Sequence, residues 1–375
     1  MMSNIPKLRF PEFKGEWEAK RIDSIFDEQK EKNHPTEDVL TIIQGTGTVP
    51  RKESGRNIIF DEKSLSNYKF VQKDDFIIHL RSFEGGLEIA NSNGIVSPAY
   101  IIMRPKLSIA SKFFYSYFRS YNFINHVLPV AVEGVRDGRQ IKYPILKEEK
   151  IPFTSFAEQQ KIADFLSNVD SIIAVETKIL NTLQKKEKAL MQKLFSQQLR
   201  FKSDDGTDFP AWEEKKLGEC VISISSGKNK KKNSAGNFPV YGSMGIIGYS
   251  EQYVYNKDCI LVARVGANAG TLHIAKGKYD VSDNTLIIEL NENELLSFYY
   301  FLLVNINLNK LNYGTGQPLV TSGMLKNIDI QLPCKAEQQK IADCLSSMDS
   351  LIQTQQNVVT TWQQRKKALL QQMFI

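Results

Sequence analysis

The sequence predicts an α+β protein in which two mixed α/β domains are separated by a long antiparallel two-helix coiled coil. Three observations favour this class. Two segments of the chain repeat each other, both carry the apolar spacing of a coiled coil, and the regions before them alternate short apolar runs with Gly, Asn and Ser. The 375 residues suffice for two domains of ~150 residues each.

The repeat is clearest where residues 157–164 and residues 336–343 both read AEQQKIAD. The two copies stay in register to their ends, so that Phe195 matches Phe374. Weaker echoes pair Leu8-Arg9-Phe10 with Leu199-Arg200-Phe201, and Trp17 with Trp212. We infer a tandem duplication, with a first domain at 1–152, a helix at 153–200, a second domain at 201–333 and a second helix at 334–375.

Both repeated segments are expected to be long helices that pair with each other. Their apolar residues recur at steps of four and three, as in a coiled-coil seam. The seam residues are Ile162, Leu166, Val169, Ile173, Leu180, Leu183, Leu190 and Leu194, then Ile341, Leu345, Met348, Ile352, Val359, Trp362, Leu369 and Met373. Each helix could instead pack on its own domain, but ~40 residues span ~60 Å, which is too long for that. Because the second domain begins at the far end of the first helix, the second helix has to run back, and the pair is antiparallel about a pseudo-twofold axis.

Each domain is expected to contain short strands and one aromatic helix. The predicted strands lie at 71–80, 95–103, 259–265 and 285–290, with a strand–turn–strand at 238–248. The predicted helices at 110–123 and 294–305 carry aromatic residues at helical spacing, which favours a place in the core over a base-stacking surface.

No group of residues has the pattern of an active site. The Asn/Asp-Pro-Pro-Tyr/Phe tetrapeptide of methyltransferases is absent, and Gly45-Thr46-Gly47 lacks the third glycine of a dinucleotide loop, so we interpret it as a turn. The four cysteines fit no zinc pattern, and the four histidines have no partners at ligand spacing. We expect no catalytic residue, metal or cofactor in this chain.

Composition favours a cytoplasmic protein that can meet an acidic partner. No stretch of ~18 apolar residues is present, which excludes a membrane span, and no apolar segment follows Met1. The net charge is +6 and the pI about 8.9. Basic residues gather in polar loops of both halves, at Arg51, Lys52, Arg56, Arg81, Arg136, Arg139, Lys228, Lys230, Lys231 and Arg264. Such side chains bind phosphates and arginine reads guanine, although a solvated surface cluster is the alternative.

Together these features resemble the DNA-specificity subunit of type I restriction–modification systems over essentially the whole chain. The resemblance rests on the two AEQQKIA segments, each after an Ile/Leu–Pro pair, and on four ordered segments of the second domain. Those segments are Ser226-Gly227-Lys228, Arg264–Gly270, Val281-Ser282-Asp283-Asn284 and Gly314–Pro318. The first domain departs from this pattern at Arg81–Gly86 and Val96–Ala99, and Gly138-Arg139-Gln140 echoes the last segment only in part, so its DNA-reading residues transfer less directly.

The resemblance implies a non-catalytic subunit that recognises a bipartite target in double-stranded DNA, with one half-site per target recognition domain. It adds Asn268 and Asn284 to the DNA-binding residues. It also implies two modification (methyltransferase) subunits, which use S-adenosylmethionine to methylate adenine N6. Two restriction subunits, which use ATP and Mg²⁺ to translocate and cut DNA, would join them. Those cofactors are expected in the partner subunits.

The start of each repeat is expected to bind a partner. A coiled-coil seam does not need this polar face, and its duplication fits two identical partners. The residues concerned are Glu158, Gln159, Gln160, Glu337, Gln338 and Gln339. The alternative is a shared cap or a contact with the chain's own domains.

Two other functions remain open on the sequence. One is a standalone DNA-acting enzyme with degenerate motifs, which would be active as the purified chain. The other is a non-catalytic DNA-binding protein unrelated to restriction.

Overall fold

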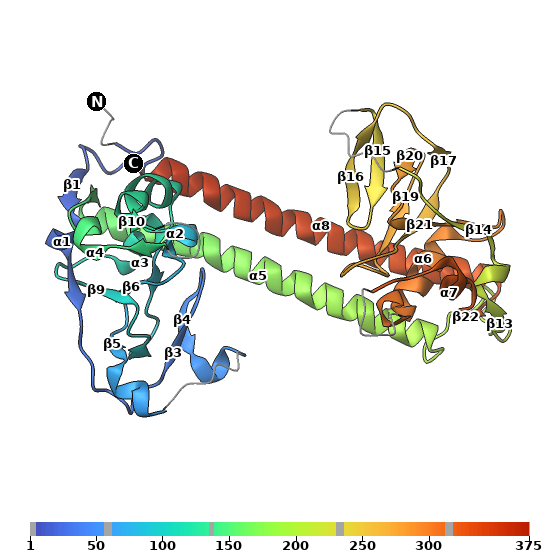
Figure 1. Ribbon diagram of the computed structural model, residues 1–375, viewed down its shortest axis with the longest axis horizontal. Helices are drawn as coiled ribbons and strands as arrows, with labels where there is room; N and C mark the ends of the chain where they lie inside the picture. Colours follow the sequence, from blue (N-terminus) through green and yellow to red (C-terminus); the bar gives the residue numbers. More distant parts are fainter. Residues whose placement is uncertain (1–4, 56–61, 135–138, 230–235, 312–317, 375) are drawn as a thin grey trace. The chain divides into compact units, whose positions relative to one another are not determined.

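The computed structural model describes residues 5–55, 62–134, 139–229, 236–311 and 318–374. The chain divides into two units, which we call unit 1 (Met1–Thr177 with Asn357–Ile375) and unit 2 (Lys178–Gln356). Both divisions fall inside long helices, α5 (Phe156–Phe195) and α8 (Lys335–Met373), labelled in Figure 1. Each unit therefore contains one domain and one part of each long helix.

Unit 1 is built on a four-stranded antiparallel sheet in the order β2-β9-β6-β7. These strands are β2 (Phe26–Gln29), β9 (Ile101–Pro105), β6 (Phe76–Ile78) and β7 (Glu88–Ile89). A second group joins the hairpin β3 (Leu40–Ile43)–β4 (Gly47–Pro50) to the pair β5 (Lys69–Val71)–β8 (Gly94–Val96) through a parallel bridge between Val39 and Ile95. The remaining pairs are β1 (Glu18–Arg21) with β12 (Lys150–Phe153), and β10 (Val132–Glu133) with β11 (Gln140–Ile141). Its short helices are α1 (Ile22–Ile25), α2 (Ser82–Gly85), α3 (Ser111–Tyr117) and α4 (Tyr143–Leu146).

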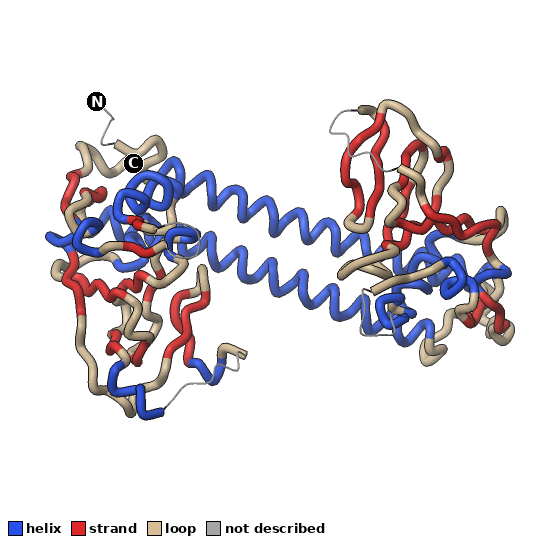
Figure 2. Tube along the Cα trace, in the orientation of Figure 1, coloured by secondary structure: helices blue, strands red, loops and turns tan. Residues whose placement is uncertain are grey.

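Unit 2 has an antiparallel sheet in the order β14-β21-β18-β19 and a second sheet in the order β16-β15-β20-β17, drawn in red in Figure 2. The first comprises β14 (Val221–Ser226), β21 (Thr285–Leu290), β18 (Cys259–Ala263) and β19 (Leu272–Ala275). The second comprises β16 (Gly245–Ser250), β15 (Phe238–Gly242), β20 (Lys278–Val281) and β17 (Tyr255–Asn256). A pair of β13 (Glu213–Lys216) with β22 (Asp329–Leu332), and helices α6 (Leu296–Ile306) and α7 (Ser322–Lys326), complete the unit.

The two units repeat the same topology. In each, the main-sheet strand that comes first in sequence pairs with the one that comes last. The hairpin of the second group also joins a later strand, β8 in unit 1 and β20 in unit 2, by parallel pairing. The predicted α+β class, with two α/β regions and two long helices packed together, is confirmed. The duplication inferred from the two helices thus extends to the domains, whose sequences have diverged.

The predicted strands are found with two changes, both in unit 1. The segment 71–80 is divided by a turn at Asp74, which has a φ of 73°, and 95–103 is divided by a turn in which Tyr100 N–H donates to the carbonyl of Ser97. The predicted helix 110–123 is also shorter, because α3 ends at Tyr117. A second, π-type turn then begins at Phe123, whose N–H donates to the Ser120 hydroxyl.

Each unit has its own aromatic core, as the helical spacing of these side chains predicts. In unit 1 the rings of Trp17, Phe113 and Tyr117 surround Phe374, which follows the end of α8. In unit 2 the matching Phe195 at the end of α5 packs on Phe298 of α6, with ring centroids 5.8 Å apart. The end of each long helix is therefore held by the aromatic helix of one domain.

The long helices pair in antiparallel fashion within each unit. In unit 1, Ile162 and Leu166 near the start of α5 share a core with Met373 at the end of α8. In unit 2, Leu194 near the end of α5 shares a core with Ile341 near the start of α8. All the predicted seam residues are buried or half-buried, so the coiled-coil pattern identified the packed face correctly. Among the described residues, no helix has the length and apolar character needed to cross a membrane.

Candidate nucleic-acid interface

Four separated segments of unit 2 meet at one edge of its main sheet. Gly227 N–H donates to the carbonyl of Thr285 at 3.0 Å, which ties the end of β14 to the start of β21. Arg264 N–H donates to the carbonyl of Asn284 at 2.9 Å, and Val320 N–H donates in turn to the carbonyl of Arg264 at 2.8 Å. The backbone therefore gathers segments that lie about a hundred residues apart in sequence.

Four side chains at this edge are basic or amidic, and the half-buried carboxylate of Asp283 lies in one of the same segments. Lys228, Asn268 and Asn284 are exposed and Arg264 is half-buried. We call these four residues the unit 2 edge. Protonated amines and guanidinium groups bind phosphate oxygens, while guanidinium and amide groups can also pair with base edges in the major groove. The chemistry of the unit 2 edge is thus that of a nucleic-acid contact, with both kinds of group present.

Glycines allow the backbone at the unit 2 edge to close up. A Cβ on Gly227 would lie 2.3 Å from the carbonyl oxygens of Val281 and Ser282. Gly270 has a φ of +92°, and a Cβ there would lie 2.4 Å from Asn309 Oδ1. Side chains at these positions would push the loops apart, which explains why glycine follows the basic residues at this edge.

Unit 1 brings Arg81 and Arg139 into the same neighbourhood. Arg81 is exposed and lies just before α2. Arg139 is also exposed, and its guanidinium carbon lies 4.0 Å from the ring centroid of Phe83, a residue of α2. The next two residues, β11 (Gln140–Ile141), pair with β10 here, whereas the counterpart segment in unit 2 bonds to the Arg264 segment. We call Arg81 and Arg139 the unit 1 edge.

Arg51 and Lys52 occupy a different place, the short turn after β4. Lys52 is exposed and pairs with Asp38 at 3.1 Å, whereas Arg51 is half-buried. Arg56, Arg136, Lys230 and Lys231 lie outside the described residues. The structure therefore locates eight of the twelve predicted DNA-binding residues and groups six of them into two edges.

The predicted partner-binding residues are mostly buried inside the chain. Glu158, Gln159, Glu337 and Gln338 are at most 2% exposed. Glu158 accepts two hydrogen bonds from the Arg9 guanidinium, at 2.7 and 2.9 Å. These four repeated residues therefore contact the chain's own domains, which was the alternative to partner binding.

Glu337 repeats this arrangement in unit 2. It accepts from Arg200 at 3.1 and 2.7 Å and from the Trp212 indole at 3.1 Å.

Burial raises the pKa of Glu158, but hydrogen bonds from Arg9 and Thr154 outweigh the effect of burial and hold that pKa below its ordinary value. Glu158 is therefore an ionised internal partner of Arg9, and Glu337 makes the equivalent contacts with Arg200.

The two glutamines of each repeat have different environments. Gln159 donates to the carbonyl of Thr154 at 2.7 Å, and Gln338 donates to the carbonyl of Pro333 at 3.0 Å, so the first glutamine ties its helix to the segment just before it. Gln160 and Gln339 are exposed and each bonds to the aspartate four residues later. Only these second glutamines are accessible to a partner, and partner binding there stays a prediction.

Arginine partners for these glutamates were missed in the sequence reading. The signal was present, because Leu8-Arg9-Phe10 and Leu199-Arg200-Phe201 echo each other just as the glutamates do. A second missed carboxylate is the buried Glu88, which accepts from the N–H groups of Gly45 and Gly47 at 2.8 and 3.0 Å. It holds the β3–β4 turn, so the segment Gly45-Thr46-Gly47 is a hairpin turn, as we interpreted it.

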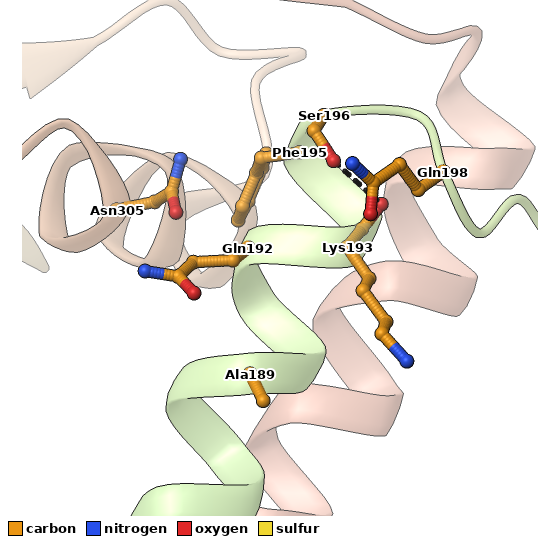
Figure 3. Close-up of a pocket in the computed structure, with 7 residues that line it drawn as sticks. All are labelled: Ala189, Gln192, Lys193, Phe195, Ser196, Gln198 and Asn305. Atoms are coloured by element: carbon orange, nitrogen blue, oxygen red, sulfur yellow. Dashed lines mark hydrogen bonds between the residues drawn. The ribbon is translucent and has the colours of Figure 1, made fainter.

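Each unit also has a cavity beside the end of one long helix. In unit 2, about 530 Å³ is lined by Gln192 and Phe195 of α5 and by Asn305 of α6 (Figure 3). In unit 1, about 390 Å³ is lined in part by Gln371 of α8, the repeat counterpart of Gln192. The unit 2 cavity is not lined by residues of the unit 2 edge, whereas the unit 1 cavity is bordered by Phe83, the ring that Arg139 of the unit 1 edge contacts.

The described residues contain no cluster of three or more His, Cys, Asp or Glu side chains that could hold a metal ion. The four cysteines are free. Burial raises the pKa of the Cys220 and Cys259 thiols, so that both are neutral packed groups at neutral pH.

Comparison with known proteins places this architecture. The family model of the type I restriction modification DNA specificity domain matches residues 14–185 and again residues 211–361. The chain therefore belongs to this family, and it contains the family's domain twice. It is a DNA-specificity subunit of a type I restriction–modification system, the non-catalytic member of such complexes.

Individual relatives agree over nearly the full length. The type I restriction enzyme MjaVIII specificity subunit of Methanocaldococcus jannaschii is 26% identical, over 97% of this chain and 92% of its own length. The solved specificity subunit of M. genitalium has a TM-score of 0.63 at 19% identity, with 99% of both chains covered. A chain from a structural study of complex assembly and conformational transition of the type I R-M system has a TM-score of 0.53 at 16% identity, with 96% of this chain and 97% of that chain covered. These two structures share the fold.

Proposed function

We propose that each unit reads one half of a bipartite DNA target through its own edge. The observation that carries this proposal is the convergence of Lys228, Arg264, Asn268 and Asn284 at one sheet edge of unit 2. Arg81 and Arg139 occupy the corresponding place in unit 1. Two edges on two copies of one domain suit two short half-sites, and the divergence of the loops suits two different base sequences.

The residues at the unit 2 edge divide into two roles. Lys228 is exposed, so it fits a phosphate contact that adds affinity for any sequence. Arg264 is half-buried and its backbone is held on both sides, by Asn284 and Val320. An arginine whose backbone is fixed in this way fits a bidentate contact from its guanidinium to guanine O6 and N7, which adds specificity.

The test uses this chain in complex with its modification subunits and measures competition for duplexes that contain the methylated sequence. We expect Arg264→Ala to cost roughly 1–3 kcal/mol and to relax one base position of one half-site. Lys228→Ala should weaken all sequences alike and reduce the salt slope by about one unit. Lys276→Ala, an exposed lysine at the other end of β19, is the matched control. Unchanged affinity and motif in Arg264→Ala would place the reading surface elsewhere.

The complex we propose contains two modification subunits, and two restriction subunits for cleavage. Support comes from two features found in both units: an exposed second glutamine at the start of a long helix, and a cavity beside the end of one. Two equivalent surfaces suit two copies of one partner. S-adenosylmethionine, ATP and Mg²⁺ would then act in the partner subunits, and the complex would work in the cytoplasm, as the sequence predicts.

Docking at the helix starts is tested by charge replacement. Gln160→Arg and Gln339→Arg place a bulky charge on exposed positions without disturbing the buried glutamines. Each variant should lose one of two modification subunits in native mass spectrometry, while Ser171→Arg, exposed about three turns further along α5, should lose none. Full assembly of both glutamine variants would show that the partners bind elsewhere.

A further inference from the structure

The hairpin β15–β16 of unit 2 has a group of exposed apolar side chains. Met244 at its turn is 76% exposed, and Ile246, Ile247 and Tyr249 on β16 are 51%, 37% and 43% exposed. The strand β16 lies at the end of its sheet, so one side of it has no paired strand among the described residues. Residues 238–250 contain no charged side chain. Exposed edge strands normally carry charged side chains or are covered by another segment. An apolar edge strand with no charged residue therefore indicates a binding surface.

The turn of this hairpin lies next to the unit 2 edge. Ser282 N–H donates to the carbonyl of Tyr241, one residue before the end of β15, at 2.8 Å. Ser282 in turn precedes Asn284, whose carbonyl accepts from Arg264. On its other side the turn approaches β19, because a Cβ on Gly245 would lie 3.6 Å from His273 Cε1. The apolar turn and the basic edge therefore share one end of unit 2.

We propose that the β15–β16 ribbon enters the major groove of the half-site bound by unit 2, with Met244 against the C5-methyl group of a thymine. This inference rests on the proposed function and names the element and the base group involved. The major groove, ~12 Å wide, admits a two-stranded β-ribbon. Its apolar feature is the thymine methyl, the one group an uncharged, methionine-tipped ribbon can recognise without a polar partner. Lys228 and Arg264, which lie beside the turn of the ribbon, supply the phosphate and base contacts that hold it there.

The matching hairpin of unit 1 has a polar turn in the same location. Its residues Gln44, Gly45 and Thr46 are exposed. Gln44 packs closely against α2, because a Cβ added to Gly85 would lie only 1.6 Å from Gln44 Nε2. The turn thus lies beside the unit 1 edge, and Glu88 fixes it from behind. The two ribbons share a position and differ in chemistry, as expected if each contacts different bases. Met244 should therefore affect one half-site only.

The experiment compares thymine with uracil, which lacks only the C5-methyl group, at each thymine of the target duplex. The complex of this chain with its modification subunits should lose about fourfold in affinity at one thymine of one half-site, from the loss of one buried methyl. Met244→Ala should bind the thymine duplex as the natural chain binds the uracil duplex, and its uracil response at that position should disappear. Val254→Ala, 63% exposed at the opposite end of the sheet, should retain both affinity and response.

Two further measurements, the melting temperature and the sequence preference of the complex, distinguish a failed ribbon contact from misfolding and from a failure of the proposed function. Met244 is not one of the non-glycine residues with positive φ among those described, so Ala fits its backbone and the melting temperature should be unchanged. If Met244→Ala binds with natural affinity and keeps the uracil response, or if no uracil affects the natural complex, the ribbon contact is wrong while sequence-specific binding stands. A complex without any sequence preference would instead overturn the proposed function.

Discussion

The Arg9–Glu158 and Arg200–Glu337 pairs show how residues far apart in sequence secure each long helix. Each arginine precedes a domain, and each glutamate begins the helix that follows that domain. Both glutamates are buried, and their partners are only 12% and 27% exposed in their side chains. A carboxylate buried in this way is stable only while its charge is paired. The identity of the two AEQQ segments therefore reflects internal pairing as well as any partner.

Removing the arginine should be costly for stability. Arg9→Met keeps the apolar stem but leaves Glu158 buried without its cation, and we expect a loss of roughly 3 kcal/mol in the free energy of unfolding. Arg21→Met, which breaks an exposed pair with Asp23, should cost less than ~1 kcal/mol. Urea unfolding of both variants provides the comparison. Equal losses would mean that the buried pair has no special weight.

The same pair gives a pH dependence. The pKa of Glu158 is lowered on folding, so its pairing stabilises the chain above the ordinary glutamate pKa of 4.5. This contribution is lost as the pH falls through the lower pKa of the folded state. Stability curves between pH 7 and pH 3 should therefore fall less steeply in Arg9→Met than in the natural chain. A steeper fall in the variant would contradict the assignment.

At the scale of elements, equivalent positions of the two long helices carry different charges in the two units. In unit 1, Asp170 of α5 forms an ion pair with Lys366 of α8. The repeat counterparts of these residues in unit 2 are Asp349 and Glu187, two like charges. Burial, and then the charge of Asp349, raise the pKa of Glu187. The helix pair is thus stabilised in unit 1 by an ion pair between α5 and α8, whereas the equivalent positions in unit 2 carry like charges.

Restoring the opposite charge should strengthen unit 2. Glu187→Lys reproduces the arrangement of unit 1 and should raise the free energy of unfolding by about 0.5 kcal/mol, the value of an exposed pair. Because the raised pKa makes ionised Glu187 unfavourable, the gain should appear as the pH rises above 4.5 and be small below it. Glu292→Lys, the same charge reversal at an exposed position of unit 2, serves as the charge-matched control. A gain that is the same at pH 4 and pH 7 would exclude this origin.

The elements also show what sequence could and could not predict. The seam residues from Ile162 to Met373 were identified because a heptad spacing is a local pattern with one structural meaning. The strands 259–263 and 285–290 were found because a short apolar run between turn residues is also a local pattern. Glu158 was read as surface because a polar residue at a helix start looks exposed until its partner, 149 residues earlier, is known. Contacts at that distance depend on the fold, which local patterns do not contain.

The candidate site was predictable to the same extent. Lys228, Arg264 and Asn284 were singled out from residue type and glycine context, but their convergence appears only when the backbone bonds between β14, β18 and β21 are known. Met244 was overlooked because an apolar residue in a turn carries no charge signal. The structure makes it conspicuous, since its side chain is 76% exposed in an uncharged hairpin.

At the scale of the whole molecule, one duplication accounts for the composition of both units. Each unit contains one domain, one part of each long helix, one edge and one hairpin turn beside that edge. A duplicated reader predicts that base changes caused by a variant stay within one half of the target. Arg264→Ala should therefore alter one half-site and Arg81→Ala the other, as seen in the methylated sequences of cells that carry each variant. A variant that alters both halves would argue against separate readers.

The central claim is that this chain directs adenine methylation to a two-part DNA sequence. The most direct measurement is single-molecule sequencing of DNA from a host that expresses this chain together with its modification subunit. We expect methylated adenines in a single motif made of two short specific parts separated by a constant number of unread base pairs, and no methylation when this chain is omitted. One continuous motif, or the same methylation without this chain, would contradict the account.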